Sequence, residues 1–247
     1  STAPSITETL FALGVGNRVV GDTIYCRYPL EAQKITKIGT WMQLDTERIL
    51  SLKPDLVIVQ KTAMQTSSTI AKLGLKMLEV KFDSIADIHD SVERIAAAVG
   101  VPERGRELHR SLEQQLATMR DRVSQAPRTR VLFLVGRTPG TLDAMIAAGP
   151  RTYIDEAITA AGGRNIFESA AMSYAKISPE EVIARDPQVI IDASHGADSP
   201  SMSDAERNSQ IRLWQRYRTV SAVKSNRVIP VASEIFLVPG PRVVDLV

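Results

Sequence analysis

The sequence contains an internal repeat, and this repeat limits the architecture more than any other feature does. Residues 47–58 (ERILSLKPDLVI) align with residues 180–191 (EEVIARDPQVII) at an offset of 133 positions. Each copy predicts a short helix that stops before a proline, followed by a buried strand. Upstream, residues 8–17 (ETLFALGVGN) resemble residues 156–165 (EAITAAGGRN), and both are helix patterns ended by glycine. The two halves of the chain therefore share one plan.

Short apolar runs alternate with helical patterns in both halves, which is typical of an α/β fold with mainly parallel sheets. The runs predicted as buried strands are 56–59, 77–80, 131–135, 189–191 and 228–231. Between the halves, apolar residues recur at three- and four-residue spacing, which predicts one amphipathic helix over about residues 102–125. We expect two Rossmann-like lobes, residues 1–100 and 127–247, joined by a single long backbone helix within residues 101–126.

Charge and motifs exclude several classes of protein. The 30 Lys and Arg against 28 Asp and Glu are too balanced for a nucleic-acid footprint. Three dispersed histidines predict no zinc or manganese cage, and no Walker A, HExxH, GxSxG or dinucleotide-binding motif is present. No run of about 18 apolar residues predicts a membrane span. The first residues run straight into a helix pattern and the last ones begin another, so we expect a processed or trimmed chain.

Aromatic residues gather in two loops of the first half. Ligands of parallel α/β sheets bind beyond the carboxyl ends of the strands, so two such lobes predict a ligand cleft between them. The loops are residues 25–29 (YCRYP), after an expected strand at 19–24, and residues 39–44 (GTWMQL). Tyr28 and Trp41 suit an apolar wall for a flat or ring-shaped ligand. Packing of both rings beneath the loops is the alternative interpretation.

Two further residues are weaker candidates for the functional site. Cys26 lies in the first loop, and with no partner base in the sequence it is more simply a small buried residue than a nucleophile. His195 follows a strand of the repeat, so it is a candidate for the cleft.

The repeat places Glu47 and Glu180 at equivalent positions, near the start of helices that follow Asp45 and Ser178. An acid there interacts favourably with the helix dipole, which is one interpretation of both residues. The other is a symmetric pair of docking charges for a partner with matching arginines on two subunits.

The order and spacing of several segments resemble the helical-backbone substrate-binding proteins of ABC importers that carry cobalamin, ferric siderophores or haem. The resemblance covers essentially the whole chain. Besides the 47–58 repeat, it rests on residues 3–8 (APSITE), 26–29 (CRYP), 148–150 (AGP), 161–165 (AGGRN) and 240–242 (GPR).

The resemblance implies a non-enzymatic, monomeric binder in the periplasm, or lipid-anchored outside the cytoplasmic membrane. It would deliver its ligand to a permease dimer with a cytoplasmic ATPase, and Glu47 and Glu180 match the family's docking acids. An enzyme of two α/β domains, such as a glycosyl transferase, is the rival class, but it would show a nucleotide or metal motif.

The resemblance also implies the ligand-binding residues. In the cobalamin branch, aromatic residues line the pocket at the positions of Tyr28 and Trp41. Cys26, in the same loop as Tyr28, is a further candidate ligand-binding residue. Haem binders use a tyrosine near this loop as iron ligand, so Tyr28 fits both. On the second lobe, Tyr174, His195 and Phe236 stand where the cobalamin branch has tryptophans. We expect a corrinoid first, a ferric siderophore second and haem third, with no resident cofactor.

Overall fold

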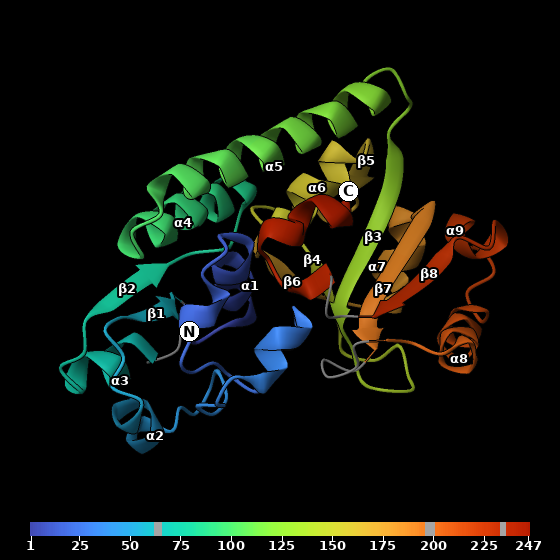
Figure 1. Cartoon of the computed structure of the whole chain (residues 1–247). Helices are drawn as coiled ribbons and strands as arrows, with labels where there is room; N and C mark the ends of the chain where they lie inside the picture. The colour runs from blue at the N-terminus through green and yellow to red at the C-terminus, as the bar shows by residue number, and fades with distance from the viewer. Residues whose placement is uncertain (62–65, 196–200, 233–235) are drawn as a thin grey trace. The chain divides into compact units, whose positions relative to one another are not determined.

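The chain folds into two compact α/β units (Figure 1). The computed structural model describes residues 1–61, 66–195, 201–232 and 236–247. Unit 1 comprises Ser1–Gln114 and Pro239–Pro241, and unit 2 comprises Gln115–Val238 and Arg242–Val247. The boundary falls within the long helix α5 (Pro102–Val123), so each unit receives one part of this helix. None of the helices in the described ranges has the length and hydropathy needed to cross a bilayer.

Unit 1 is built on a two-stranded parallel sheet in which Val57 pairs with Met77 and Gln60 with Val80. Its buried core includes Ile49, Val59 and Ile70. The expected strand at 19–24 is reduced to one isolated bridge between Asp22 and Lys37. The elements of unit 1 before α5 are α1 (Pro4–Ala12), η1 (Gly16–Arg18), η2 (Leu30–Lys34), α2 (Thr46–Ser51), β1 (Val57–Gln60), α3 (Thr66–Lys72), β2 (Met77–Val80) and α4 (Ile85–Ala98).

Unit 2 contains a six-stranded sheet in the order β6-β4-β3-β7-β8, with β5 paired to β3. Strands β5, β7 and β8 run parallel to their neighbours, whereas β4 pairs antiparallel with β3 and β6. The mainly parallel α/β class is therefore confirmed, with an antiparallel edge. The elements are β3 (Thr129–Gly136), β4 (Met145–Ala148), α6 (Tyr153–Ala160), β5 (Gly163–Asn165), β6 (Tyr174–Ile177), α7 (Pro179–Arg185), β7 (Val189–His195), α8 (Asp204–Trp214), α9 (Ser221–Lys224), β8 (Val228–Ala232) and η3 (Pro241–Leu246).

The internal repeat is visible in the caps of the helices. Helix α2 begins at Asp45, whose side chain accepts a hydrogen bond from the third helical residue, and α7 begins at Ser178 with the same bond. The glycines after α1 and α6 both have left-handed backbones, with φ of 71° at Gly14 and 76° at Gly162. Glycine adopts this conformation at little cost, and it closes a helix by turning the chain away from the axis.

Candidate ligand-binding and docking surfaces

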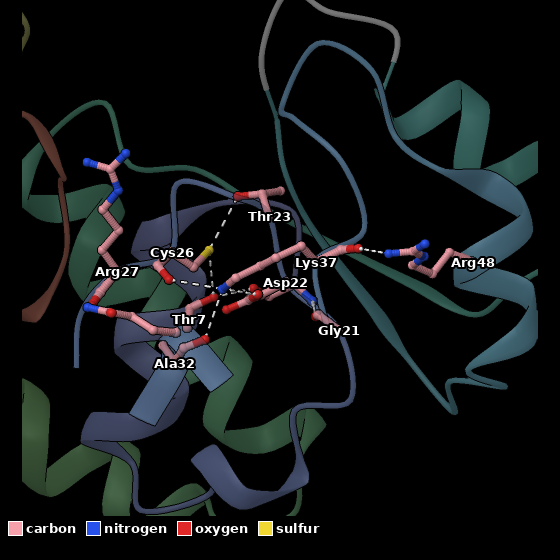
Figure 2. A network of polar contacts seen from close by, with 11 residues as sticks. Thr7, Gly21, Asp22, Thr23, Cys26, Arg27, Ala32, Lys37 and Arg48 are labelled. Atoms are coloured by element: carbon pink, nitrogen blue, oxygen red, sulfur yellow. Dashed lines mark hydrogen bonds and ion pairs between the residues drawn. The ribbon is translucent and has the colours of Figure 1, made fainter. Parts of the chain in front are cut away.

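The ammonium group of Lys37 ties together the loop of residues 22–32 in unit 1 (Figure 2). Its Nζ donates hydrogen bonds to Asp22 Oδ1 at 2.8 Å, to the Ala32 carbonyl at 2.9 Å and to the Cys26 carbonyl at 3.2 Å. Three acceptors satisfy the three donors of an ammonium group. The loop that carries two tyrosines is thus held at its start, its middle and its end by one side chain.

Asp22 is completely buried and pairs with Lys37. Burial raises the pKa of this carboxyl to about 6, although the hydrogen bond and the positive charge of Lys37 oppose the shift. Within the described residues, Asp22 Oδ2 has no hydrogen-bond partner. Burial outweighs the ion pair because desolvation of a carboxylate is costly when only one of its oxygens is satisfied.

The side chain of Cys26, within this loop, is buried beneath the loop backbone. Only 1% of it is exposed, the Thr7 hydroxyl donates to its Sγ at 3.2 Å, and the Thr23 hydroxyl lies 3.3 Å from the same sulfur. Burial raises the pKa of the thiol, so the thiol stays protonated at neutral pH. The structure gives Cys26 contacts that support the loop, and leaves its side chain out of reach of solvent.

A pocket of about 270 Å³ lies beyond the carboxyl end of β1. It is lined by Thr2, Ala3, Pro4, Tyr25, Trp41, Gln60 and Thr66. Trp41 is 45% exposed, and Tyr28, outside this lining, is 46% exposed. Sequence reasoning selected Trp41 but passed over Tyr25, whose only signal was its place in the aromatic loop. Apolar rings with open faces at a strand end can bind a planar ligand.

The loop that presents Trp41 depends on a glycine. Gly39 has φ of 104°, and a Cβ atom there would lie 2.4 Å from the carbonyl oxygen of Gln43. Gly39 bridges to Leu44, and the Thr40 amide donates to the Gln43 carbonyl at 2.9 Å. The chain therefore reverses within a few residues, which places Trp41 at the tip of a tight turn.

A second pocket of unit 1, of about 310 Å³, lies at the other end of β1, against Pro54 and Val57. Its lining also includes Leu10 and Val15 from the first helix and the turn after it. Ligands of parallel α/β sheets bind at the carboxyl ends of the strands. The pocket beside Gln60 is therefore the candidate site.

A buried polar network lies along β3 and β7 in unit 2. Arg137 Nε donates to Asp192 Oδ2 at 3.2 Å, and both side chains are 1% exposed. Trp214 Nε1 donates to the same oxygen at 3.3 Å, and the Ser194 amide donates to Asp192 Oδ1 at 3.1 Å. This network was not predicted from the sequence, in which its only indication is an acid within an apolar strand. His195 ends β7, and its side chain lies outside the described part of the structure.

The other candidates in unit 2 differ in exposure. Tyr174 is 44% exposed at the start of β6. Phe236 is partly buried, with its ring 6.5 Å from that of Phe133, and its carbonyl accepts a hydrogen bond from the Tyr153 hydroxyl at 3.1 Å. Burial raises the pKa of Tyr153 well above its ordinary value, and the nearby charge of Tyr174 adds to the shift. Tyr174 presents a ring to the surface, whereas Phe236 packs largely against its own unit.

Glu47 and Glu180 occupy the second position of α2 and of α7, and both are exposed. Neither carboxylate has a hydrogen-bond or ion-pair partner within the ranges that the structure describes. The adjacent charged residues are engaged, because Arg48 pairs with Asp45 at 3.4 Å and Glu181 accepts from the Ser178 amide at 2.9 Å. In each copy of the repeat, the same acid is left available to a partner.

The sequence matches the family model described as periplasmic binding protein over residues 1–234. The vitamin B12-binding protein of Salmonella paratyphi A is 29% identical over 244 residues, which cover 98% of this chain and 84% of the relative. Among solved structures, the periplasmic heme-binding protein RhuT from Roseiflexus sp. RS-1, in apo form, is 30% identical with a TM-score of 0.82, covering 99% of this chain and 93% of that one. The vitamin B12-binding protein BtuF of Vibrio cholerae shares the fold, at 24% identity, with a TM-score of 0.80 and coverage of 99% and 91%.

The α/β units and these matches define a substrate-binding component of an ABC importer, and the role of this family is ligand binding. Within that class, the chain belongs to the periplasmic binding protein family. The resemblance seen in the sequence is thereby confirmed, and it implies a periplasmic location and a permease as partner.

Proposed function

We propose that this protein captures cobalamin, or a related corrinoid, and hands it to the membrane permease of its importer. The observation that carries the proposal is the similarity to vitamin B12-binding proteins over 98% of the chain. The rings of Trp41 and Tyr25 beside Gln60 support it, because they offer a face suited to a large, flat ligand. A pocket of about 270 Å³ holds part of such a ligand. Tyr174 and His195 of unit 2 are proposed as further contacts, and the ligand is cargo, so no resident cofactor is needed.

Haem is the second candidate, and one specific feature favours it. Tyr28 is 46% exposed in the loop held by Lys37, and a phenol oxygen is a suitable ligand for ferric iron. The similarity to a heme-binding protein at 30% identity points the same way. A ferric siderophore is the third candidate, since it would use the same exposed aromatic surface.

We further propose that the protein acts as a monomer, free in the periplasm or lipid-anchored, and that it docks on a permease dimer coupled to a cytoplasmic ATPase. Glu47 and Glu180, which have no partner among the residues that the structure describes, support this mode of docking, since a pair of equivalent acids fits a pair of basic side chains on two subunits.

Titration with cyanocobalamin, with hemin and with ferric desferrioxamine, followed by absorption and tryptophan fluorescence, tests the proposal. The expected result is saturable uptake of one cyanocobalamin, seen in its absorption spectrum and as quenching of tryptophan fluorescence. Tight uptake of hemin alone would assign the protein to haem. Uptake of none of the three would contradict the proposed function.

A further inference from the structure

One stretch of unit 2 is strongly basic. Residues 207–232 contain six of the chain's 30 Lys and Arg residues and none of its 28 Asp and Glu residues. The rest of the chain is therefore net negative, although the chain as a whole is nearly balanced. A local excess of one charge attracts partners of the opposite charge when the fold brings the charges together.

The fold gathers this stretch at one edge of unit 2. Figure 1 shows α8, α9 and β8 side by side there, and β8 is the last strand in the order of the sheet. Trp214, Val220 and Ala222 are buried and anchor the stretch to the core. The Tyr217 amide donates to the Trp214 carbonyl at 2.9 Å, and the Arg227 amide donates to the Ala222 carbonyl at 2.7 Å. Closed turns therefore carry the charged side chains.

Five of the six cations have no hydrogen-bond or ion-pair partner among the residues that the structure describes. All five are exposed, and we call them the basic corner: Arg212, Arg216, Arg218, Lys224 and Arg227. The sixth, Arg207, donates to the Pro230 carbonyl at 3.0 Å. Asp186, which accepts from Ser221 of α9, is already paired with Arg130 at 3.0 Å. Like charges on neighbouring turns repel one another, so an anionic partner would stabilise this arrangement.

Protection of the sheet edge does not account for the basic corner. Charges that prevent two sheets from pairing lie on the edge strand itself, whereas these five lie before β8 (Val228–Ala232). Interfaces between proteins have an apolar centre. Ile229 is the one large hydrophobic residue of the stretch 207–232 that is exposed. Charge therefore outweighs apolar contact here, which suits an array of mobile anions better than a second protein.

We propose that the basic corner contacts the anionic phospholipid head groups of the membrane that holds the permease. A bilayer presents mobile phosphate groups, which can gather opposite the five cations without a preformed complementary shape. Arginine binds phosphate oxygens through its planar fork, and lysine supplies a point charge. Each cation contributes little, so the contact is weak, reversible and sensitive to salt. It keeps the carrier near the membrane whichever ligand the carrier holds.

The test measures cosedimentation of the chain with vesicles made of equal parts of phosphatidylglycerol and phosphatidylcholine. The wild-type chain is expected to bind these vesicles at low ionic strength, to dissociate as salt is added, and to leave vesicles of phosphatidylcholine alone unbound. The triple variant Arg216→Gln/Arg218→Gln/Lys224→Gln is expected to lower the vesicle affinity about 100-fold, since each cation contributes about fivefold.

The matched control is the triple variant Lys34→Gln/Lys72→Gln/Lys76→Gln, which changes the net charge by the same amount at exposed lysines of unit 1. It should bind the anionic vesicles about as well as the wild-type chain does. Urea denaturation of both triple variants reports whether they are folded. The substitutions are at exposed positions, so the unfolding midpoints should stay close to that of the wild type.

Three results would overturn the proposal. One is unchanged vesicle binding by the folded Arg216→Gln/Arg218→Gln/Lys224→Gln variant, and another is an equal loss in the control variant, which would assign the effect to net charge. The third is a wild-type chain that binds neither kind of vesicle, and its retention by immobilised polyglutamate through the same three residues would then assign the basic corner to an acidic protein. Because the vesicles contain no permease and no ligand, failure here leaves the proposed ligand function to be tested separately by cyanocobalamin titration.

Discussion

Lys53 and Asp186, which lie 133 positions apart, adopt the same left-handed backbone, with φ of 46° and 43°. Each stands between a helix and a strand, and each immediately precedes a proline. The left-handed conformation costs a non-glycine residue free energy because its Cβ crowds the following carbonyl. The repeat therefore preserves a backbone geometry while the side chains carry opposite charges.

Glycine at these two positions is expected to have opposite effects. Lys53→Gly should raise the free energy of unfolding by about 0.5–1 kcal/mol, since it relieves the left-handed strain. Asp186→Gly should lower it by about 1 kcal/mol, because the carboxylate accepts hydrogen bonds from the Ser221 amide and hydroxyl, both at 2.7 Å. Urea denaturation of both variants measures the two changes. Stabilisation by both substitutions would show that the Ser221 hydrogen bonds do not outweigh the strain, and destabilisation by both would show that relief of strain does not outweigh loss of the side chain.

Removal of the ring at the tip of the 39–44 turn should weaken ligand binding. Trp41→Ala is expected to reduce cyanocobalamin affinity by about 10- to 100-fold, because a large aromatic contact is lost. Met42→Ala is the control, since Met42 is 70% exposed in the same turn and is absent from the pocket lining. Isothermal titration calorimetry of both variants compares the losses, and equal losses would exclude a specific contact of Trp41.

Tyr28→Phe separates the two leading ligands. The variant keeps the aromatic ring and removes the phenol oxygen, so cyanocobalamin affinity should change by less than about threefold. If the protein binds haem through this oxygen, the Soret band of the hemin complex should shift and hemin affinity should fall. Tyr25→Phe is the control for loss of a neighbouring hydroxyl. An unaltered hemin spectrum in the Tyr28→Phe variant would rule out Tyr28 as the iron ligand.

The buried Asp22 should make unit 1 more stable in mild acid. Its pKa is raised to about 6 from 3.8, so the folded state binds more protons than the unfolded state between about pH 4 and pH 6. The free energy of unfolding should therefore fall by about 3 kcal/mol, relative to Asp22→Asn, as the pH rises through that window. Thermal unfolding of both proteins at about pH 4 and pH 7 measures this difference.

Asp186→Asn is the control for that experiment, because the contribution of Asp186 to stability changes with pH in the opposite direction. The hydrogen bonds from Ser221, and then the charge of Arg130, lower the pKa of Asp186. Its contribution to stability is present above about pH 4 and is lost as the pH falls further. A constant difference between wild type and Asp22→Asn across the whole range would contradict the raised pKa of Asp22.

Features with a local pattern could be predicted from the sequence. The 47–58 repeat carries its own helix stop and strand, and the structure reproduces both in α2–β1 and α7–β7. The long amphipathic pattern predicted α5 to within about two residues. These elements depend on spacing and on proline, which act over a few positions.

Features that depend on residues far apart in the sequence could not be predicted from it. The expected strand at 19–24 failed because Asp22 is held by Lys37 and the chain then turns into the aromatic loop. Arg137 and Asp192 lie 55 positions apart, and no periodic pattern in the sequence predicts a contact between them. Tyr25 belongs to the pocket only because Trp41 and Gln60 come to its side in the fold.

The pocket beside Gln60 is assembled from the start of α1, two loops, the end of β1 and the start of α3, which span Thr2 to Thr66. Cargo seated there would contact all of these segments at once, so it acts as a reversible crosslink whose strength follows ligand concentration. Amide hydrogen exchange in these segments should slow together on loading. An importer that senses such local rigidity distinguishes a full carrier from an empty one without any large movement.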